Sequence, residues 1–399
     1  MARRTEIGKT KMSYTKKELC KMWERPPERQ IAVMQAKILE AFRRTNGKIA
    51  IAWSGGKDSS YLVYKAAQIW AQQSYWTEEK KLLMVCFADT TNEHKLTRRY
   101  IKSFLPYVEK KFGIKIELYK TRPAKNQTFV TAAKSQGLPL ISKNVAMGVR
   151  KLRRALHTAH LKFEDVAPYA EPTMDNVNKL LEMGLPKTGI LTLTGYSFKR
   201  GNFGTAFKLA KRWLPLVPAE EIEVSEKCCN ILKKQPMKTL MSELGHFQPM
   251  IGEMAQDSKQ RESAYLKSGC NSFRNGKGKS KPMGPMTEQG VLFGIAYDKV
   301  PMSEYYGQLV CENCQYRFTD ENRGGCALCG FGIEFESDRF VKLQKYEPAK
   351  VKLAFTPKSE GGLGYLEACE FLNKYCKCKI QIPIIPTEQE NDTSLKNDA

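Results

Sequence analysis

Residues 49–60 (IAIAWSGGKDSS) place a glycine-rich turn between two apolar segments. The apolar run before the turn predicts a buried strand, and the apolar spacing after it predicts a helix over residues 59–73. Gly55 and Gly56 tolerate positive φ and let backbone N–H groups approach an anion, while Lys57 adds a full positive charge at the helix N-terminus. Hydroxyls are available on Ser54, Ser59 and Ser60. The turn therefore predicts a phosphate site, although it is too short for the GxxxxGK[ST] loop of P-loop NTPases.

This turn resembles the PP-loop of the adenine nucleotide α-hydrolase superfamily, whose members cleave ATP between its α- and β-phosphates. Later segments resemble phosphoadenosine phosphosulfate (PAPS) reductase-like proteins, and they follow in the order of that family. These segments are Val85–Thr90, Gly137–Lys143, Glu226–Cys229, Gly252 with Asp257, Ser258 and Arg261, Thr287–Gln289, and Cys326–Cys329. The resemblance extends over about residues 45–345.

The resemblance implies roles for individual residues in holding ATP or another adenine nucleotide. The loop from Ser54 to Lys57 would hold the pyrophosphate leaving group, with Mg²⁺ bridging its oxygens. Asp58 would support the metal or the loop geometry. Asp89 either faces the adenosine or caps the next helix, and Arg261 is either a phosphate contact or a surface arginine.

Twelve cysteines in a chain of 399 residues with no apolar leader indicate metal binding rather than a disulfide scaffold. Cys311 and Cys314, followed by Cys326 and Cys329, have the two-knuckle spacing of a Zn²⁺ ribbon. Spacing alone therefore favours zinc.

A second set of four competes for Cys326 and Cys329. Together with Cys228 and Cys229 they resemble the ligands of the four-iron, four-sulfur (4Fe–4S) cluster in adenosine phosphosulfate (APS) reductases, and Cys270 is a further candidate. The resemblance thus favours a cluster, and both alternatives stay open.

Two reactions are compatible with the resemblance, and they need different nucleophiles. Reduction of APS or PAPS to sulfite needs a thiolate, which the reductases carry on a C-terminal Glu-Cys-Gly-x-His segment that is missing here. Cys376 and Cys378, between lysines, are candidates if their thiol pKa is lowered, whereas the surroundings of Cys369 suit packing. In ATP pyrophosphatase chemistry, a substrate oxygen attacks the α-phosphorus, and a sulfur or nitrogen nucleophile then displaces AMP.

We expect the second reaction, an ATP-dependent sulfur transfer to nucleic acid that involves a sulfur-donor protein. The alternatives are a sulfonucleotide reductase and a non-catalytic, nucleotide-regulated zinc-ribbon protein that binds nucleic acid. The formal net charge of +23 favours polyanionic partners. Basic residues are concentrated in residues 143–154, 199–212 and 267–281, the last with Lys277, Lys279 and Lys281. No long apolar segment indicates a membrane span, so a cytoplasmic location is expected.

Strands and helices alternate through the first part of the chain. Strands are predicted over residues 49–53, 82–88 and 114–119, and helices over residues 28–45, 59–73 and 93–112, with a helical pair up to about 184. This alternation predicts a doubly wound, mostly parallel α/β sheet of adenine nucleotide α-hydrolase type, with the nucleotide at the carboxyl ends of the strands. Residues 190–195 and 249–252 are predicted as further strands, and residues 269–286 as a loop too polar to pack.

The predicted organisation has four parts. They are a basic N-terminal arm (1–30), a PP-loop nucleotide-binding domain (31–260) with a helical insertion at about 199–248, a Cys-rich helical or ribbon module (261–380), and a disordered tail (381–399).

Overall fold

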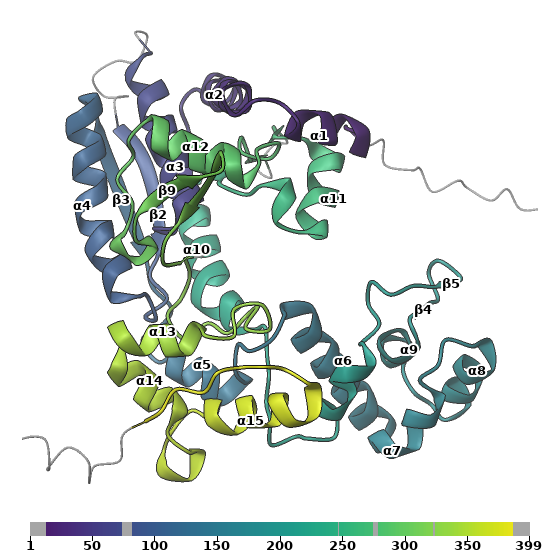
Figure 1. The fold of residues 1–399 in the computed structure, drawn as a ribbon. Coiled ribbons are helices and arrows are strands. Elements are labelled where there is room, and N and C mark those ends of the chain that lie inside the picture. Colours follow the sequence, from purple (N-terminus) through teal and green to yellow (C-terminus); the bar gives the residue numbers. More distant parts are fainter. Residues whose placement is uncertain (1–12, 74–81, 246, 274–277, 322–323, 386–399) are drawn as a thin grey trace, which may run out of the picture. The chain divides into compact units, whose positions relative to one another are not determined.

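The computed structural model describes residues 13–73, 82–245, 247–273, 278–321 and 324–385 (Figure 1). The chain divides into two compact units. Unit 1 contains the residues up to Asp89, Glu93–Arg122 and Gln235–Gly325, and unit 2 contains Thr90–Asn92, Pro123–Lys234 and the residues from Cys326 onward. This division differs from the predicted boundary near residue 260, because the first part of the predicted Cys-rich module belongs to unit 1.

Unit 1 is built on a six-stranded sheet with the order β3-β2-β1-β6-β8-β7. The strands are β1 (Ile49–Trp53), β2 (Leu82–Ala88), β3 (Lys115–Thr121), β6 (Gln248–Ile251), β7 (Asn271–Ser272) and β8 (Lys279–Ser280). All neighbouring pairs are parallel except β7 and β8. The predicted doubly wound, mostly parallel α/β fold is confirmed, and the order reverses at β1.

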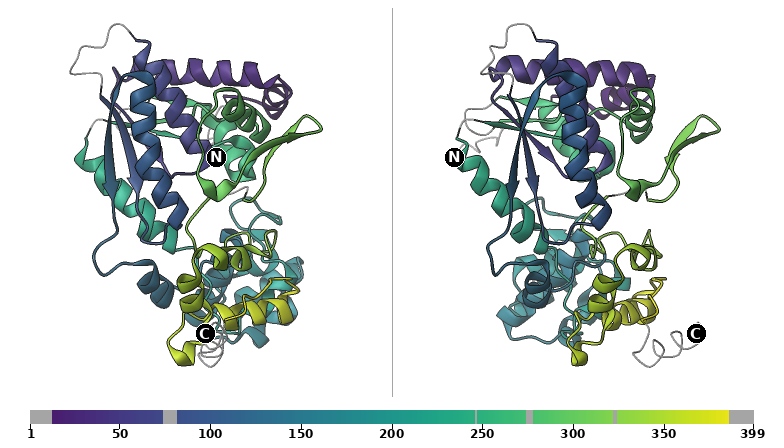
Figure 2. Two further views of the ribbon diagram at one scale, coloured as in Figure 1. Left: turned by 60° about the vertical axis from the view of Figure 1, so that its left-hand side comes forward. Right: turned by 90° about the vertical axis from the view of Figure 1, so that its left-hand side faces the viewer.

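Alternate side chains of the central strands enter two separate cores, as the two-residue period of a strand requires. Ile51 of β1 and Val85 of β2 pack beneath α2 (Pro27–Arg44), α3 (Lys57–Ala71), α4 (Lys95–Phe112) and α12 (Glu288–Tyr297). Ala50 and Met84 point to the other face, which α10 (Gln235–Glu243) covers with Met237, Leu240 and Met241. Figure 2 shows the strands with helices along both faces. Strands buried on both faces explain why β1 and β2 are nearly continuous apolar runs.

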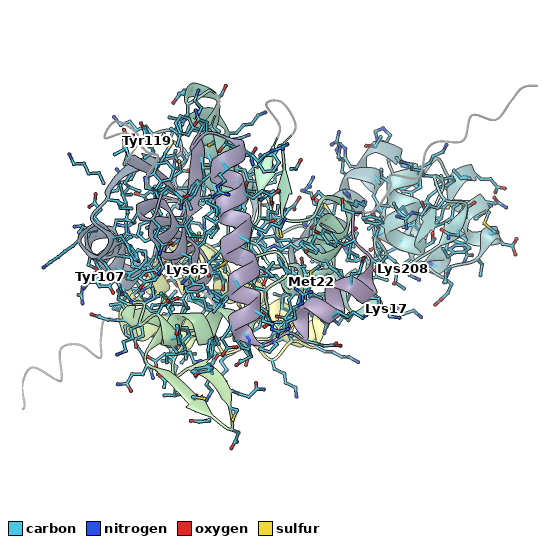
Figure 3. The ribbon with its side chains drawn as sticks, turned by 90° about the horizontal axis from the view of Figure 1, so that it is seen from above. Lys17, Met22, Lys65, Tyr107, Tyr119 and Lys208 are labelled. Carbon is cyan, nitrogen blue, oxygen red and sulfur yellow. The ribbon has the colours of Figure 1, made fainter. Side chains whose placement is uncertain are left out.

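Helices α3 and α12 run side by side in the same direction. Near their N-termini Lys57 Nζ lies 3.2 Å from Glu288 Oε1, and further along Lys65 Nζ lies 3.0 Å from Asp298 Oδ2. Lys65 is labelled in Figure 3. A Cβ on Gly294 would lie 2.2 Å from the Tyr61 hydroxyl, so the two helices approach closely there. This packing brings two helix N-termini to the carboxyl end of β1.

The predicted polar loop at residues 269–286 is wrong over its described part. Residues 271–272 and 279–280 form β7 and β8, and Ser280, Met283 and Met286 are fully buried. The ladder satisfies the backbone polar groups, and the methionines fill the core, so the lysine and glycine content did not prevent packing.

The N-terminal segment is partly folded. Helix α1 (Lys16–Trp23) begins in the predicted arm with a capping box between Thr15 and Glu18. Its Leu19 packs with Tyr265 of α11 (Lys259–Ser268). Residues 1–12 and most of the predicted disordered tail, residues 386–399, lie outside the described residues.

Unit 2 is mainly helical around one large core. Its helices are α5 (Phe129–Gln136), α6 (Lys143–Ala159), α7 (Phe163–Val166), α8 (Met174–Glu182), α9 (Lys187–Thr194), α13 (Arg339–Tyr346), α14 (Pro348–Phe355) and α15 (Tyr365–Cys376). A short hairpin joins β4 (Tyr196–Ser197) to β5 (Asn202–Phe203). Among the described residues, no helix is long and apolar enough to cross a membrane.

The strand predicted at residues 190–195 is wrong, because the segment forms helix α9. Thr192 and Thr194 donate their hydroxyls to the carbonyls of Thr188 and Ile190, both at 2.8 Å. A Cβ on Gly189 would lie 2.7 Å from Ala155 Cβ of α6. Close packing against α6 therefore outweighs the strand preference of threonine and isoleucine.

The predicted helical insertion at about 199–248 is only partly helical. It contains a 3₁₀ segment (Lys211–Leu216), a π-helical turn (Asn230–Lys234) and α10, which is a structural cover for the sheet. The first two belong to unit 2 and α10 belongs to unit 1.

Candidate functional site

The predicted phosphate loop follows β1 and leads directly into α3. Gly55 has φ +72°, and a Cβ there would lie 2.8 Å from Thr97 Cγ2, so glycine is required for both conformation and space. Gly56 is the N-cap of α3 and has no side chain that could supply a capping oxygen. The loop thus presents a helix N-terminus that its own N-cap residue leaves without a side-chain acceptor, which is the usual setting for an anion.

The three serines of the loop have different roles. The Ser54 backbone N–H donates to Ser59 Oγ at 3.2 Å, and the two hydroxyl oxygens are 3.0 Å apart. Ser60 is fully buried and accepts from Trp53 Nε1 at 2.9 Å. Ser54 and Ser59 therefore shape the turn, whereas Ser60 fixes the helix to the strand.

Lys57 is buried among carboxylates rather than directed to solvent. Its Nζ lies 3.5 Å from Asp58 Oδ1 and 3.2 Å from Glu288 Oε1, and its side chain is only 8% exposed. Burial raises the pKa of Asp58, the charge of Lys57 opposes this rise, and Asp257 and Glu288 add to it. Two cations, Lys57 and the Arg261 that pairs with Asp257, thus stand among three carboxylates.

Such a mixture suits a metal-bound nucleotide better than a bare phosphate. Mg²⁺ is commonly held by one or two carboxylates together with substrate phosphates. Asp58 and Glu288 are the residues here that fit this role, because both adjoin Lys57 at the loop. Within the described part of the chain, no three His, Cys, Asp or Glu side chains are grouped so that they could hold a metal ion.

Tyr306 is a residue of this site that the sequence did not indicate. Its hydroxyl oxygen accepts the Lys57 backbone N–H at 3.0 Å, and its ring packs on Phe318 with centroids 4.9 Å apart. The side chain is 2% exposed, and burial raises the pKa of Tyr306 well above its usual value. The neutral hydroxyl therefore occupies a backbone donor at the start of α3.

The segment with Gly252, Asp257 and Arg261 packs on the loop. A Cβ on Gly252 would lie 3.3 Å from Ser59 Cα, and Ser258 caps α11 by accepting the Arg261 N–H at 3.3 Å. The Arg261 guanidinium pairs with the Asp257 carboxylate. The structure thus places Asp257 and Arg261 near the loop, where their charges pair with each other.

Asp89 follows β2 and pairs with Arg122, whose Nε lies 2.9 Å from Asp89 Oδ2. The alternative role of Asp89 as a helix cap is wrong, because α4 begins at Lys95 and its N-cap is His94. The His94 Nδ1 accepts the Leu96 N–H at 3.1 Å.

The candidate metal ligands fall into two groups. Unit 1 contains Cys270, Cys311 and Cys314; unit 2 contains Cys228, Cys229, Cys326 and Cys329. Cys270 is buried against Tyr265, and burial raises the pKa of its thiol to about 11. Cys311 and Cys314 are exposed on the hairpin of β9 (Leu309–Glu312) and β10 (Gln315–Phe318).

The four thiols of unit 2 interact with one another. The hydrogen bond to Cys229 and burial raise the pKa of Cys228, and Cys329 and Cys326 raise it further. The same hydrogen bond lowers the pKa of Cys229, with help from Lys143. Burial raises the pKa of Cys329, and Arg339 and Lys143 oppose this rise. Two cysteine pairs distant in sequence therefore share one electrostatic environment.

The segment Gly137–Lys143 holds these two pairs in place. The Leu138 N–H donates to the Glu223 carbonyl at 2.7 Å, ahead of Cys228, and the Gly330 N–H donates to the Pro139 carbonyl at 2.8 Å, just after Cys329. Gly137 has φ +95°, and a Cβ there would lie 2.9 Å from the Glu223 oxygen.

Residues immediately after Asp89 support the second pair, and among them Asn92 could not be recognised from the sequence. Its carbonyl accepts the Ala327 N–H at 2.7 Å, and the Thr90 hydroxyl lies 3.3 Å from Cys326 Sγ. Thr90 and Asn92 thus hold the start of the turn at Cys326 and Ala327, and Pro139 holds its end at Gly330.

The chemistry of this donor set fits an iron–sulfur cluster. A 4Fe–4S cluster takes one thiolate at each of four separate iron corners, so its ligands need not surround a single point. Lys143 and Arg339 offset negative charge at these thiols. We therefore regard Cys228, Cys229, Cys326 and Cys329 as the residues that suit a cluster.

The prediction of a lowered thiol pKa near the C-terminus is wrong. Cys369 and Cys376 are fully buried, and burial raises the pKa of each to about 12. Burial also raises the pKa of Cys378. The neighbouring lysine side chains do not compensate for the loss of solvent.

Parts of the basic runs have structural partners. Arg150 pairs with Glu226, and the Arg153 Nε donates to the Val217 carbonyl at 3.1 Å. Lys281 Nζ lies 2.6 Å from Glu253 Oε2. Lys279 is exposed, and Lys277 lies outside the described residues.

Several solved structures are similar to this chain. A phosphoadenylyl-sulfate (PAPS) reductase from Candida auris, in a phosphate complex, is similar over 73% of this chain and 91% of that chain. The sequence identity is 10% and the TM-score is 0.33. No protein-family model and no curated protein matches the chain.

Proposed function

We propose that this chain is a PAPS reductase-like PP-loop enzyme that binds an adenine nucleotide and acts in sulfur transfer to nucleic acid. The observation that carries the proposal is the loop between β1 and α3. It combines a helix N-terminus whose N-cap residue is Gly56, Gly55 with φ +72° and the buried Lys57 at the carboxyl edge of a parallel sheet. Ligands of open α/β sheets bind at this edge, at the point where the strand order reverses.

The loop residues would act mainly on the leaving group. Backbone N–H groups of the loop and the Lys57 ammonium stabilise the charge that develops on pyrophosphate when the α-phosphorus is attacked. Asp58 and Glu288 would hold Mg²⁺ against the phosphate oxygens, which neutralises the same charge. A sulfur nucleophile then displaces AMP from the adenylated substrate. Asp257 keeps Arg261 close to the loop, where its second face is available to phosphate.

The four cysteines of unit 2 are the proposed ligands of a 4Fe–4S cluster, which supplies one-electron chemistry when bound. Lys143 and Arg339 would offset its negative charge, and the Thr90 hydroxyl next to Cys326 Sγ would tune it by hydrogen bonding.

Two observations favour this proposal over the alternatives. The C-terminal thiols do not suit the reduction of a sulfonucleotide, because Cys369 and Cys376 are fully buried and burial raises the thiol pKa of both and of the half-buried Cys378. A zinc ribbon needs Cys326 and Cys329 together with Cys311 and Cys314, whereas Cys326 and Cys329 act instead on the thiol of Cys228, whose pKa they raise.

The test is exchange of labelled pyrophosphate into ATP by anaerobically purified protein, with single-stranded DNA or RNA as acceptor. We expect exchange that needs Mg²⁺ and one of the nucleic acids, and no sulfite from APS or PAPS with a dithiol reductant. Sulfite formation without pyrophosphate exchange would establish the reductase instead. ATP binding without either reaction would leave a regulated binding protein.

A further inference from the structure

A cavity of about 140 Å³ lies within unit 2. It is formed by α6, α9 and the segment after β5. The lining is mostly apolar and includes Met147, Leu191, Phe207, Leu209 and Trp213. An engineered cavity of about 150 Å³ holds benzene. The volume therefore suits one six-membered aromatic ring.

One aromatic side chain of the lining suits stacking. Phe207 is 52% exposed although it lines the cavity, whereas Trp213 is 2% exposed and has the Arg212 guanidinium carbon 4.3 Å from its ring centroid. An exposed phenylalanine beside an apolar cavity gains contact area when a flat ligand covers it. Asn144 and Thr188 add polar groups suited to hydrogen bonds with the edge of a ring.

The charge of the lining is entirely positive. Lys151 and Lys208 both line the cavity and are half-buried, and the lining contains no Asp or Glu. Lys208, labelled in Figure 3, helps to lower the pKa of Glu171. That carboxylate pairs with another lysine, because Lys211 Nζ lies 2.6 Å from Glu171 Oε1. Among the described residues, neither Lys151 nor Lys208 has an ion-pair partner. Half-buried ammonium groups without carboxylates favour an anionic ligand.

We propose that this cavity binds one nucleotide, with its base stacked on Phe207 and its phosphates at Lys151 and Lys208. We assign the nucleotide to a single strand rather than to a free mononucleotide. The basic residues Lys199 and Arg200, both exposed, lie in the turn between β4 and β5, just before the cavity segment, and add to its positive charge. Bases of single strands are free to stack on aromatic side chains, whereas paired bases are not. This inference rests on the proposed function, which makes a nucleic-acid strand the substrate.

The test measures the affinity of the full-length protein for a labelled oligothymidylate, for the same strand with abasic sites, and for free TMP. Loss of one stacked base costs roughly 5- to 150-fold in affinity. We expect Phe207→Ala to weaken binding of the oligothymidylate by such a factor and Phe207→Trp to restore it. Wild type should prefer the intact strand to the abasic one, and Phe207→Ala should not. Because Phe207 is exposed, these variants leave the core intact.

The lysines are tested separately. Lys151→Gln with Lys208→Gln should reduce the slope of log affinity against log salt by roughly 1.4, or about 0.7 per phosphate contact. The control, Lys345→Gln with Lys379→Gln, removes the same charge from exposed positions of unit 2 outside the lining and should keep the slope.

The outcomes separate the cavity from the loop. Equal affinity of wild type and Phe207→Ala for intact and abasic strands would overturn the proposal. TMP binding as tight as that of the strand, weakened by Phe207→Ala, would overturn the assignment to a strand. Base discrimination in a protein that binds no ATP would uphold the cavity while refuting the proposed function. ATP binding that survives in every cavity variant is the expected result.

Discussion

The hydroxyl oxygen of Tyr306 accepts the backbone N–H of Lys57 at 3.0 Å, at the first residue of α3. The first N–H groups of a helix have no partner within the helix and are the donors that bind phosphate in such loops. Tyr306 thus occupies a donor that the nucleotide would use. The loop is preformed, with a neutral hydroxyl in place of an anionic oxygen.

Replacing Tyr306 with Phe tests this exchange of partners. Without nucleotide, the variant leaves the Lys57 N–H unsatisfied, which costs about 1–3 kcal/mol in the free energy of unfolding. Saturating Mg-ATP should reduce this loss, because a phosphate oxygen takes the same N–H. Chemical denaturation with and without ATP measures both values, and Tyr297→Phe, at a residue that is 75% exposed, is the neutral control. An equal loss in both conditions would show that ATP does not reach this donor.

The Asp58 carboxyl gives a prediction about pH. Burial raises the folded-state pKa of Asp58 above 3.8, so ionisation destabilises the folded protein and its cost grows as pH rises through that pKa. Asp58→Asn removes the ionisation. The variant should therefore gain unfolding free energy relative to wild type at neutral pH, and this gain should fade below pH 3.8. A stability difference that does not change with pH would contradict the raised pKa.

The two candidate metal sets are separated by iron and zinc counts. Cys229→Ser should remove most of the iron from anaerobically purified protein, because Cys229 belongs to the four interacting thiols of unit 2. Cys311→Ser should leave the iron content unchanged, because Cys311 is exposed on the β9–β10 hairpin. Bound zinc that is lost in Cys311→Ser and retained in Cys229→Ser would support the ribbon instead.

Gly137 holds the segment between the two cysteine pairs. Gly137→Ala combines a positive φ of +95° with a Cβ 2.9 Å from the Glu223 oxygen, so we expect a loss of unfolding free energy of about 2 kcal/mol or more and a lower iron content. Gly184→Ala is the matched control, because its φ is +77° and no atom lies within 4 Å of the added Cβ. Equal effects of the two variants would show that Gly137 has no packing role.

The sheet and the loop could be predicted because their signals are local. The bounds of β1 and β2 follow from apolar runs buried on both faces, and Gly55 marks the turn by its conformational freedom. Tyr306 gave no such signal, because it is 249 positions from Lys57. Residues 190–194 were wrongly predicted as a strand because β-branched residues favour strands. Close packing against α6 stabilises a helix there instead.

The choice between the cysteine sets also depends on long-range structure. The CxxC spacing of Cys311 and Cys314 is local and predicted a ribbon. The association of Cys326 with Cys228 instead depends on backbone hydrogen bonds from Leu138 and Gly330, which spacing does not encode.

Calorimetric titration of Mg-ATP into the wild type, Lys57→Met and Gly56→Val tests the central claim most directly. Lys57→Met removes the buried ammonium, and Gly56→Val places its side chain within 3.3 Å of Ser54 Oγ and 3.5 Å of the Tyr306 hydroxyl. Lys48→Met, at an exposed position just before β1, is the control. The account predicts that both loop variants lose at least about tenfold in affinity, about 1.4 kcal/mol, while the control binds as the wild type does. Wild-type affinity in both loop variants, with their folds intact, would contradict the assignment of the nucleotide site to this loop.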